Sequence, residues 1–238
     1  MQPFNRYESS SPAWISASTA DLEMRTRAFI RSVYGWMTVG LLLTALAAMW
    51  VVSSPMMQAL VLGNPIVMIG LVIAELGIVV FMSVKQRTIA ASTASAAFLI
   101  YSFLNGLTLS VVAFVYTRSS ITLAFGISAG MYGAMALYGL VTKRDLTSWG
   151  SFFMMGLFGV FILMIAGFFI HATALQMTIA TLGIFVFLGL TAYDNQKMKQ
   201  LAAAGAGGSM AVIGALVLYL DFVNLFLFVL RLLGDRRR

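Results

Sequence analysis

The chain has 238 residues, of which 61% are hydrophobic and only 10% are charged. A soluble domain carries about 25% charged residues, so this composition excludes an ordinary soluble protein and favours a membrane protein. The sequence has no cysteine and a single histidine. That excludes disulfide frameworks, cysteine nucleophiles, and zinc or haem sites built from several histidines or thiolates of one chain.

The net charge of +7 does not indicate a nucleic-acid partner, because the basic residues stand in short clusters between apolar segments. Lysines and arginines anchor membrane proteins in this way, so the expected partner is the lipid bilayer. Residues 1–30 are polar and lack the apolar run of a signal peptide. We interpret them as a cytoplasmic N-terminal tail, followed by a membrane domain over residues 31–238.

Seven apolar segments follow in chain order, each close to the length of about 20 residues that a membrane-spanning helix needs. They cover residues 33–52, 65–84, 89–115, 121–141, 149–170, 173–193 and 210–233. The connections are short and contain turn-forming residues, and no soluble domain is inserted between them. The predicted fold is all-α, a polytopic membrane protein with seven transmembrane helices.

Basic clusters alternate with connections of low charge, and this asymmetry predicts the orientation. The clusters precede the first helix and lie between helices two and three, four and five, and six and seven. By the positive-inside rule the N-terminus is cytoplasmic. A seventh crossing then puts the three arginines at 236–238 outside, against the rule. Either helix seven crosses against its charge bias or it enters without spanning, and its length favours a crossing.

Four ionisable residues fall within or at the end of apolar segments, namely Glu75, Asp194, Asp221 and Arg231. A carboxylate in hydrocarbon costs about 3 kcal/mol, so such residues usually face the interior of the bundle. Glu75 can line a water-filled path, pair with a basic residue, or remain a protonated acid with a local hydrogen bond. Asn224 follows Asp221 by three residues and therefore shares its helix face.

Asp194 and Asp221 are equidistant from the glycine-rich segment at 205–208. Each is about 13 residues from this turn, or about 20 Å of helix, so a helical hairpin puts both carboxyls at one depth. The spacing does not fix whether they face each other. Two carboxyls in a poorly hydrated site share one proton. Loss of that proton adds repulsion and leaves an anionic oxygen site suited to calcium, which predicts a proton-sensitive gate.

Other interpretations of the two aspartates stay open at this point. Each carboxylate can instead cap a helix end, or pair with a nearby cation, Lys197 or Arg231. Intramembrane aspartyl proteases also place one catalytic aspartate after a tyrosine, as in Tyr193-Asp194. Their second aspartate follows a Gly-x-Gly turn, whereas a Tyr-Leu pair precedes Asp221. We therefore expect no enzymatic activity.

Three stretches resemble signatures of the Bax inhibitor-1 family. They are Gly-Leu-Thr-Ala-Tyr-Asp-Asn-Gln-Lys at 189–197, Tyr-Leu-Asp-Phe-Val-Asn-Leu-Phe at 219–226 and Asn-Gly-Leu-Thr-Leu-Ser at 105–110. Together with the seven-helix pattern, the resemblance covers nearly the whole chain after the tail. The stretch Val-Tyr-Gly-Trp-Met-Thr at 33–38 is similar to the bacterial branch of the family, which resides in the inner membrane.

The resemblance implies a central seventh helix wrapped by the other six. It also implies a pH-sensitive calcium leak, in which Asp194 and Asp221 form the sensor and bind calcium as the transported ion, with no cofactor. An alternative function that bacterial relatives imply is a regulator of a membrane-bound protease in the stress response. In that case the N-terminal tail would be the contact.

Residues in or near helix two have further roles by the same resemblance. Glu75 matches the acidic residue that the family carries in this helix. The family also implies an arginine after helix two that latches the closed state, for which Arg87 and Lys85 are the nearest candidates. We therefore expect the pore or gate to involve Glu75, Asn224 and Arg87.

Overall fold

The structure, a computed structural model, describes residues 13–170, 172–235 and 237. The helices are α1 (Ala13–Ser53), α2 (Pro55–Val61), α3 (Pro65–Val84), α4 (Ala91–Leu109), α5 (Val112–Val115), α6 (Arg118–Val141), α7 (Thr147–Phe169), α8 (Thr173–Ala203) and α9 (Gly208–Leu233). Seven helical segments are long and apolar enough to cross a membrane, so the predicted seven-helix membrane fold is confirmed. Residues 1–12 of the expected tail, together with Arg236 and Arg238, lie outside the described part of the chain.

Local chemistry explains several of the helix boundaries. Proline occupies the first turn of α2 and of α3, where the missing N–H would have no helical partner in any case. The side chain of Asn64 caps α3 by accepting hydrogen bonds from the N–H groups of Ile66 and Val67. Gly205 turns the chain between α8 and α9 with a φ of +79°, in the left-handed region that favours glycine. The hairpin turn therefore lies where the glycine-rich segment predicts it.

Three of the predicted helices differ most in extent from the structure. The segment expected at 89–115 is interrupted, because α4 ends at Leu109 and the short α5 follows it. Helix α8 continues past 193 to Ala203, since its polar residues Asn195 and Gln196 are buried against neighbouring helices. Helix α1 runs unbroken from Ala13 to Ser53, so residues 30 and 31 lie within one continuous helix.

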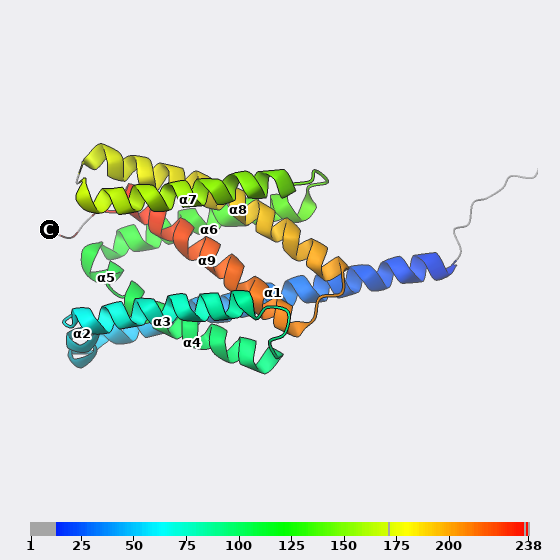
Figure 1. The fold of residues 1–238 in the computed structure, drawn as a ribbon, viewed down its shortest axis with the longest axis horizontal. Coiled ribbons are helices and arrows are strands. Elements are labelled where there is room, and N and C mark those ends of the chain that lie inside the picture. The colour runs from blue at the N-terminus through cyan, green and yellow to red at the C-terminus, as the bar shows by residue number, and fades with distance from the viewer. Residues whose placement is uncertain (1–12, 171, 236, 238) are drawn as a thin grey trace, which may run out of the picture.

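Helix α9 passes through the middle of the bundle (Figure 1). It contacts α1, α4, α6 and α8, while α3 packs against α4 and α7 packs against α8. Within its most apolar stretch 72% of the residues are buried, compared with 11% in α3 and in α7. The expected central position of the seventh membrane helix is therefore confirmed.

The outer helices present large apolar side chains away from the core. Exposed examples are Ile66, Ile73 and Leu76 on α3, and Phe152 and Phe158 on α7. Apolar surface of this extent is unfavourable in water, and lipid tails solvate it without cost. The polar groups of the sequence are consequently concentrated inside the bundle and at its two ends.

The two described ends of the chain lie at opposite ends of the bundle (Figure 1). The segment after α9 is held against the connection between α5 and α6. The N–H of Asp235 donates to the hydroxyl of Ser120 at 2.9 Å, and the N–H of Arg237 donates to the carbonyl of Val115 at 2.9 Å. Helix α9 therefore crosses the full length of the bundle, as its apolar length predicts, and does not turn back.

Candidate functional site

Asp194 on α8 and Asp221 on α9 meet inside the bundle. The two residues are only 8% and 5% exposed, and their carboxyl groups lie close enough to interact directly. The hairpin formed by α8 and α9 brings them together. The packing of α9 on α8 sets the helix rotation, which the spacing along the sequence leaves open.

Within the described residues, no cation forms an ion pair with either of these aspartates. Lys197 is exposed and forms no ion pair with Asp194, and Arg231 donates instead to the side chain of Gln176. The ion pairs present in the described part of the chain both lie on the exposed surface of α1. The structure therefore brings the two carboxyls to each other and not to Lys197 or Arg231.

Helix α6 forms a third wall of the site through the hydroxyl of Tyr132. This buried hydroxyl lies near both carboxyls and near the amide of Asn195. Its hydrogen bonds are long, 3.4 Å to the carbonyl of Leu218 and 3.7 Å to Sδ of Met37. Oδ2 of Asp221 is buried and has no hydrogen-bond partner among the described residues. Because an unpaired buried anion is costly, this arrangement suits a carboxyl pair that holds a proton. We call Asp194, Asp221 and Tyr132 the aspartate site.

Asn195, the residue after Asp194, connects α8 to α1. It is fully buried, and its Oδ1 accepts a hydrogen bond of 2.5 Å from the hydroxyl of Tyr34 on α1. Its amide group donates to the carbonyl of Thr191 at 2.7 Å. Helix α1 is therefore tied to α8 one residue away from the aspartate pair.

Glu75 lies in a second polar cluster, which links four helices. Oε2 of Glu75 accepts a hydrogen bond of 3.1 Å from Asn105, and Oε1 accepts one of 2.9 Å from Thr108. Oδ1 of Asn105 in turn accepts a hydrogen bond of 2.9 Å from the hydroxyl of Tyr219 on α9. That hydroxyl also bonds to Oγ1 of Thr44 on α1, at 2.6 Å. We call these five residues the Glu75 cluster; of the three interpretations of Glu75, the local hydrogen bond is the one present.

The aspartate site and the Glu75 cluster lie on opposite sides of α9. Tyr219 and Asp221 are two residues apart on this helix, which corresponds to a rotation of about 200° at about 100° per residue. Tyr219 therefore points toward α1 and α4, where its hydrogen bonds lie. Asp221 points toward α8, where it meets Asp194.

The remaining candidate residues do not join either group. Arg87 and Lys85 are exposed in the connection between α3 and α4, and neither forms an ion pair with a described residue. Asn224 is half-buried, and its amide donates to the carbonyl of Leu220 on its own helix at 2.8 Å. The expected latch is therefore not formed in this conformation, and Asn224 does not bond to Asp221.

Sequence reasoning missed most of the neutral residues that complete the two groups. Asn105, Asn195 and Tyr219 stand in the signature stretches at 105–110, 189–197 and 219–226, so the motifs carried a signal for them. Tyr132 and Thr44 sit in ordinary apolar segments, and nothing in their spacing distinguishes them from packing residues.

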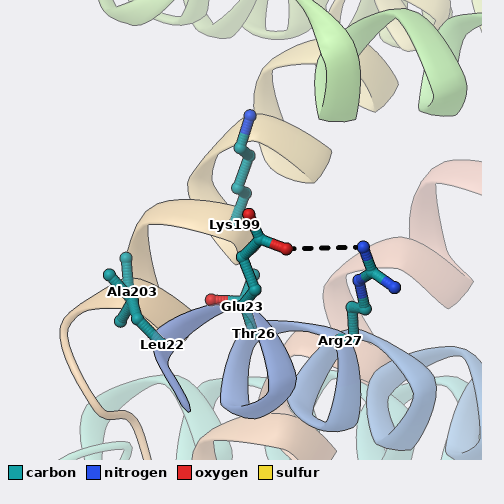
Figure 2. Close-up of a pocket in the computed structure, with 6 residues that line it drawn as sticks. All are labelled: Leu22, Glu23, Thr26, Arg27, Lys199 and Ala203. Carbon is teal, nitrogen blue, oxygen red and sulfur yellow. Dashed lines mark hydrogen bonds and ion pairs between the residues drawn. The ribbon is translucent and has the colours of Figure 1, made fainter. Parts of the chain in front are cut away.

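A shallow pocket of about 360 Å³ lies where α1 leaves the bundle beside the end of α8 (Figure 2). Its lining residues are Leu22, Glu23, Thr26, Arg27, Lys199 and Ala203. Arg27 pairs with Glu23 at 3.5 Å, and Nζ of Lys199 donates to the carbonyl of Leu140 near the end of α6 at 2.9 Å. Both cations of the pocket are thus already engaged, and the pocket lies apart from the aspartate site.

Comparison with known proteins identifies the family. The family model described as inhibitor of apoptosis-promoting Bax1 matches residues 26–238. The inner membrane protein YbhL of Escherichia coli (strain K12) is 42% identical over 215 residues, which cover 88% of this chain and 92% of the relative. An uncharacterized protein of Borreliella burgdorferi is 38% identical over 214 residues, with 88% and 92% coverage. YrjE of Lactococcus lactis is 35% identical over 216 residues, with 87% and 90% coverage.

The family match includes every residue of the aspartate site and of the Glu75 cluster, because it runs from residue 26 to residue 238. It agrees with the seven membrane-spanning helices and with the central position of α9. The chain therefore belongs to the Bax inhibitor-1 family of membrane proteins.

Proposed function

We propose that this protein is a passive, proton-gated leak for cations, with calcium as the transported ion. The observation that carries the proposal is the meeting of Asp194 and Asp221, which are buried together and have no ion-pair partner among the described residues. Such a pair changes its charge when it gains or loses a proton. A charge change inside a membrane-embedded bundle alters both its packing and its affinity for cations.

Proton sharing between the two aspartates determines whether flux rises or falls with pH. With one proton between them, the two carboxyls hydrogen-bond to each other and hold α8 against α9. Without that proton, two like charges repel each other in a medium that screens them poorly. Flux is therefore expected to rise as pH rises and to fall on acidification.

Calcium fits this site as a passing ion. Calcium binds six to eight oxygen ligands, and the site offers two carboxylates with the neutral hydroxyl oxygen of Tyr132 close by. No group of three or more His, Cys, Asp or Glu side chains gathers anywhere in the described part of the chain. So small a set of charged ligands supports transient passage, in which an ion must leave as readily as it enters.

We further propose that the protein has no enzymatic activity. Asp221 lies in the continuous helix α9, whose backbone groups are internally bonded and therefore not free to hold a peptide substrate. A peptide-cleavage assay on the purified protein tests this directly. Cleavage that disappears in Asp221→Asn would establish a protease in place of a leak.

We further place the protein in a bacterial inner membrane with its N-terminus in the cytoplasm. The connections after α3 and α6, which carry basic residues, and the end of α8, which carries Lys197 and Lys199, lie at the same end of the bundle as the start of α1 (Figure 1). The relative YbhL is named as an inner membrane protein. Reporter fusions before α1 and after α9 test the orientation. They are expected to report opposite sides of the membrane.

The gating proposal is tested by calcium flux into proteoliposomes at several pH values. Asp194→Asn and Asp221→Asn keep the size of each side chain but remove the charge, so both variants are expected to lose the pH dependence. Asp145→Asn is the matched control, because this aspartate is exposed and lies between α6 and α7. Identical flux profiles in the parent and in both site variants would overturn the proposal.

A second function, regulation of a membrane-bound protease by direct binding, is favoured by one feature. Helix α1 extends beyond the bundle (Figure 1), and it exposes the apolar side chains of Leu22 and Met24 there. Deletion of residues 1–20, or the double variant Leu22→Ser and Met24→Ser, is expected to abolish a stress phenotype without changing ion flux. Loss of flux together with the phenotype would contradict this second function.

A further inference from the structure

Tyr219 is anchored more firmly than other side chains of α9. It is among the largest fully buried residues, and its hydroxyl bonds to Thr44 on α1 at 2.6 Å and to Asn105 on α4 at 2.9 Å. Its ring also meets Phe98 and Tyr101 edge-on, with centroids 5.8 Å away in both cases. Contacts in so many directions leave this side chain one orientation.

The orientation of Tyr219 fixes the direction in which Asp221 points. Helix α9 is continuous between the two residues, and two residues of α-helix correspond to about 200° of rotation. A rotation of α9 that broke the bonds of Tyr219 would therefore turn Asp221 away from Asp194 by the same angle. No other hydrogen bond to α9 from α1 or α4 is present among the described side chains.

Helix α8 is also anchored to α1 by a tyrosine hydroxyl. The hydroxyl of Tyr34 on α1 donates to Asn195 at 2.5 Å, one residue after Asp194. Tyr34 and Thr44 are ten residues apart on α1, which corresponds to about 15 Å along its axis. One straight helix thus holds both of the helices that carry an aspartate.

The surroundings of Thr44 make this helix a rigid support. A Cβ added at Gly106 of α4 would lie 2.5 Å from the carbonyl oxygen of Thr44, so only glycine lets the two backbones approach this closely. The carbonyls of Gly40 and Ser102 lie 2.9 and 2.8 Å from Oγ1 of Thr44, as alternative acceptors for the one proton that this hydroxyl can donate. Small displacements of α1 relative to α4 are therefore opposed by hard contacts.

We propose that α1 is a brace for the aspartate pair, with Tyr34 and Tyr219 as positioning residues that make Asp194 and Asp221 face each other. The proposal concerns the geometry of the pair and stands on the hydrogen bonds from α1. It rests on the proposed leak function only for its effect on flux. The two proposals can therefore fail separately.

Cysteine cross-linking tests whether positions 194 and 221 lie close together, independently of ion flux. The natural chain has no cysteine, so only the introduced thiols can form a bridge. Asp194→Cys combined with Asp221→Cys puts two thiols at the positions in question, and a disulfide forms only when their Cβ atoms come within about 4.5 Å. The expected result is rapid bridging in membranes under mild oxidation. Addition of Tyr34→Phe is expected to slow bridging about fivefold, the effect of losing one hydrogen bond, and Tyr219→Phe, which loses two, is expected to slow it at least as much.

Tyr101→Phe is the matched control, because Tyr101 is a buried tyrosine of α4 with no hydroxyl hydrogen bond to a described residue. Its bridging rate is expected to equal that of the double-cysteine parent. Thr44→Val removes the bond to Tyr219 from the α1 side and serves as a second variant if Tyr219→Phe does not fold. Unchanged bridging in both Tyr34→Phe and Thr44→Val would overturn the brace.

The same tyrosine variants, with both aspartates intact, separate the brace from the leak function. If the brace and the leak are both correct, Tyr219→Phe shifts the pH profile of calcium flux and Tyr101→Phe does not. If bridging slows while the flux profile is unchanged, the brace holds and the aspartate pair is not the gate. A flux shift without any change in bridging contradicts the brace.

Discussion

The Glu75 cluster and the aspartate site place acidic groups on opposite sides of α9, and the hydrogen-bond partners of these carboxyl groups differ. Both oxygens of Glu75 accept hydrogen bonds, and the donors belong to a chain of side chains from α1, α4 and α9. In the aspartate site, the neighbour of each carboxyl is another carboxyl, and Oδ2 of Asp221 has no donor among the described residues.

Under the proposed function, this difference separates a structural polar network from one that responds to pH. A buried network in which every group has a partner rigidifies the helices that carry it. A buried carboxyl pair without full hydrogen bonding is stable only while a proton is shared, so it responds to pH. Under the proposed function the two groups are complementary, because the first would hold α9 still while the second would change its charge.

The largest expected effect comes from breaking the Glu75 cluster. Asn105→Ala removes the donor to Oε2 of Glu75 and the acceptor of the Tyr219 hydroxyl at once. Oε2 of Glu75 then lacks a donor and the Tyr219 hydroxyl keeps only its bond to Thr44, so two buried hydrogen bonds are lost and the free energy of unfolding is expected to fall by on the order of 3 kcal/mol. Thermal unfolding in detergent measures this. An unchanged midpoint would show that the cluster does not hold the bundle together.

The aspartate site is expected to behave in the opposite way. Asp194→Asn or Asp221→Asn removes the repulsion of the deprotonated pair, so each variant should be more stable than the parent at alkaline pH, by on the order of 2 kcal/mol. The difference should shrink on acidification, when the parent pair regains its proton. The measurement is the unfolding midpoint against pH. A variant less stable than the parent at alkaline pH would contradict the repulsion.

Glu75→Gln gives a smaller effect that sharpens the contrast. One of the two carboxylate oxygens becomes an amide group that cannot accept a hydrogen bond, so stability is expected to fall by about 1 kcal/mol. The pH dependence of calcium flux should survive, because the aspartate pair is untouched. Loss of that dependence in Glu75→Gln would move the sensor to the other face of α9.

The smallest effect is expected at Asp145, outside both groups. Its Oδ1 accepts hydrogen bonds from the N–H and the hydroxyl of Thr147, at 2.9 and 2.6 Å, and these bonds hold the pKa of Asp145 below its usual range. A lowered pKa stabilises the folded state above the unfolded value, and this contribution is lost as pH falls through the folded pKa. Because the carboxylate is exposed, Asp145→Asn should change the unfolding midpoint only slightly, and should remove that acid-side dependence.

Much of the fold could be predicted from the sequence, because a span in lipid must be about 20 apolar residues long. The prediction of α3 at 65–84 coincides with the observed helix. The polar end of α8 was missed, since Asn195 and Gln196 read as loop residues until their hydrogen-bond partners on α1 and in the α6–α7 connection are known.

The sequence predicted the depth of Asp194 and Asp221 in the bundle, but not the rotation of the helices that makes them face each other. Similar distances from the glycine-rich segment at 205–208 predict that Asp194 and Asp221 lie at one depth, whereas whether they face each other depends on helix rotation, which the spacing does not fix. Tyr132 belongs to a third helix and has no counterpart in the hairpin. Side-chain partners from different helices leave no periodic pattern, which is why the neutral members of the site escaped prediction.

Infrared spectroscopy of the membrane-reconstituted protein is the most direct test that Asp194 and Asp221 share a proton. A protonated carboxyl has its own C=O stretching band, separate from the bands of carboxylates. The parent is expected to lose such a band over the same pH range in which calcium flux rises, and the double variant Asp194→Asn and Asp221→Asn is expected to lack this change. An identical pH-dependent band in the parent and in the double variant would show that the pair holds no titrating proton.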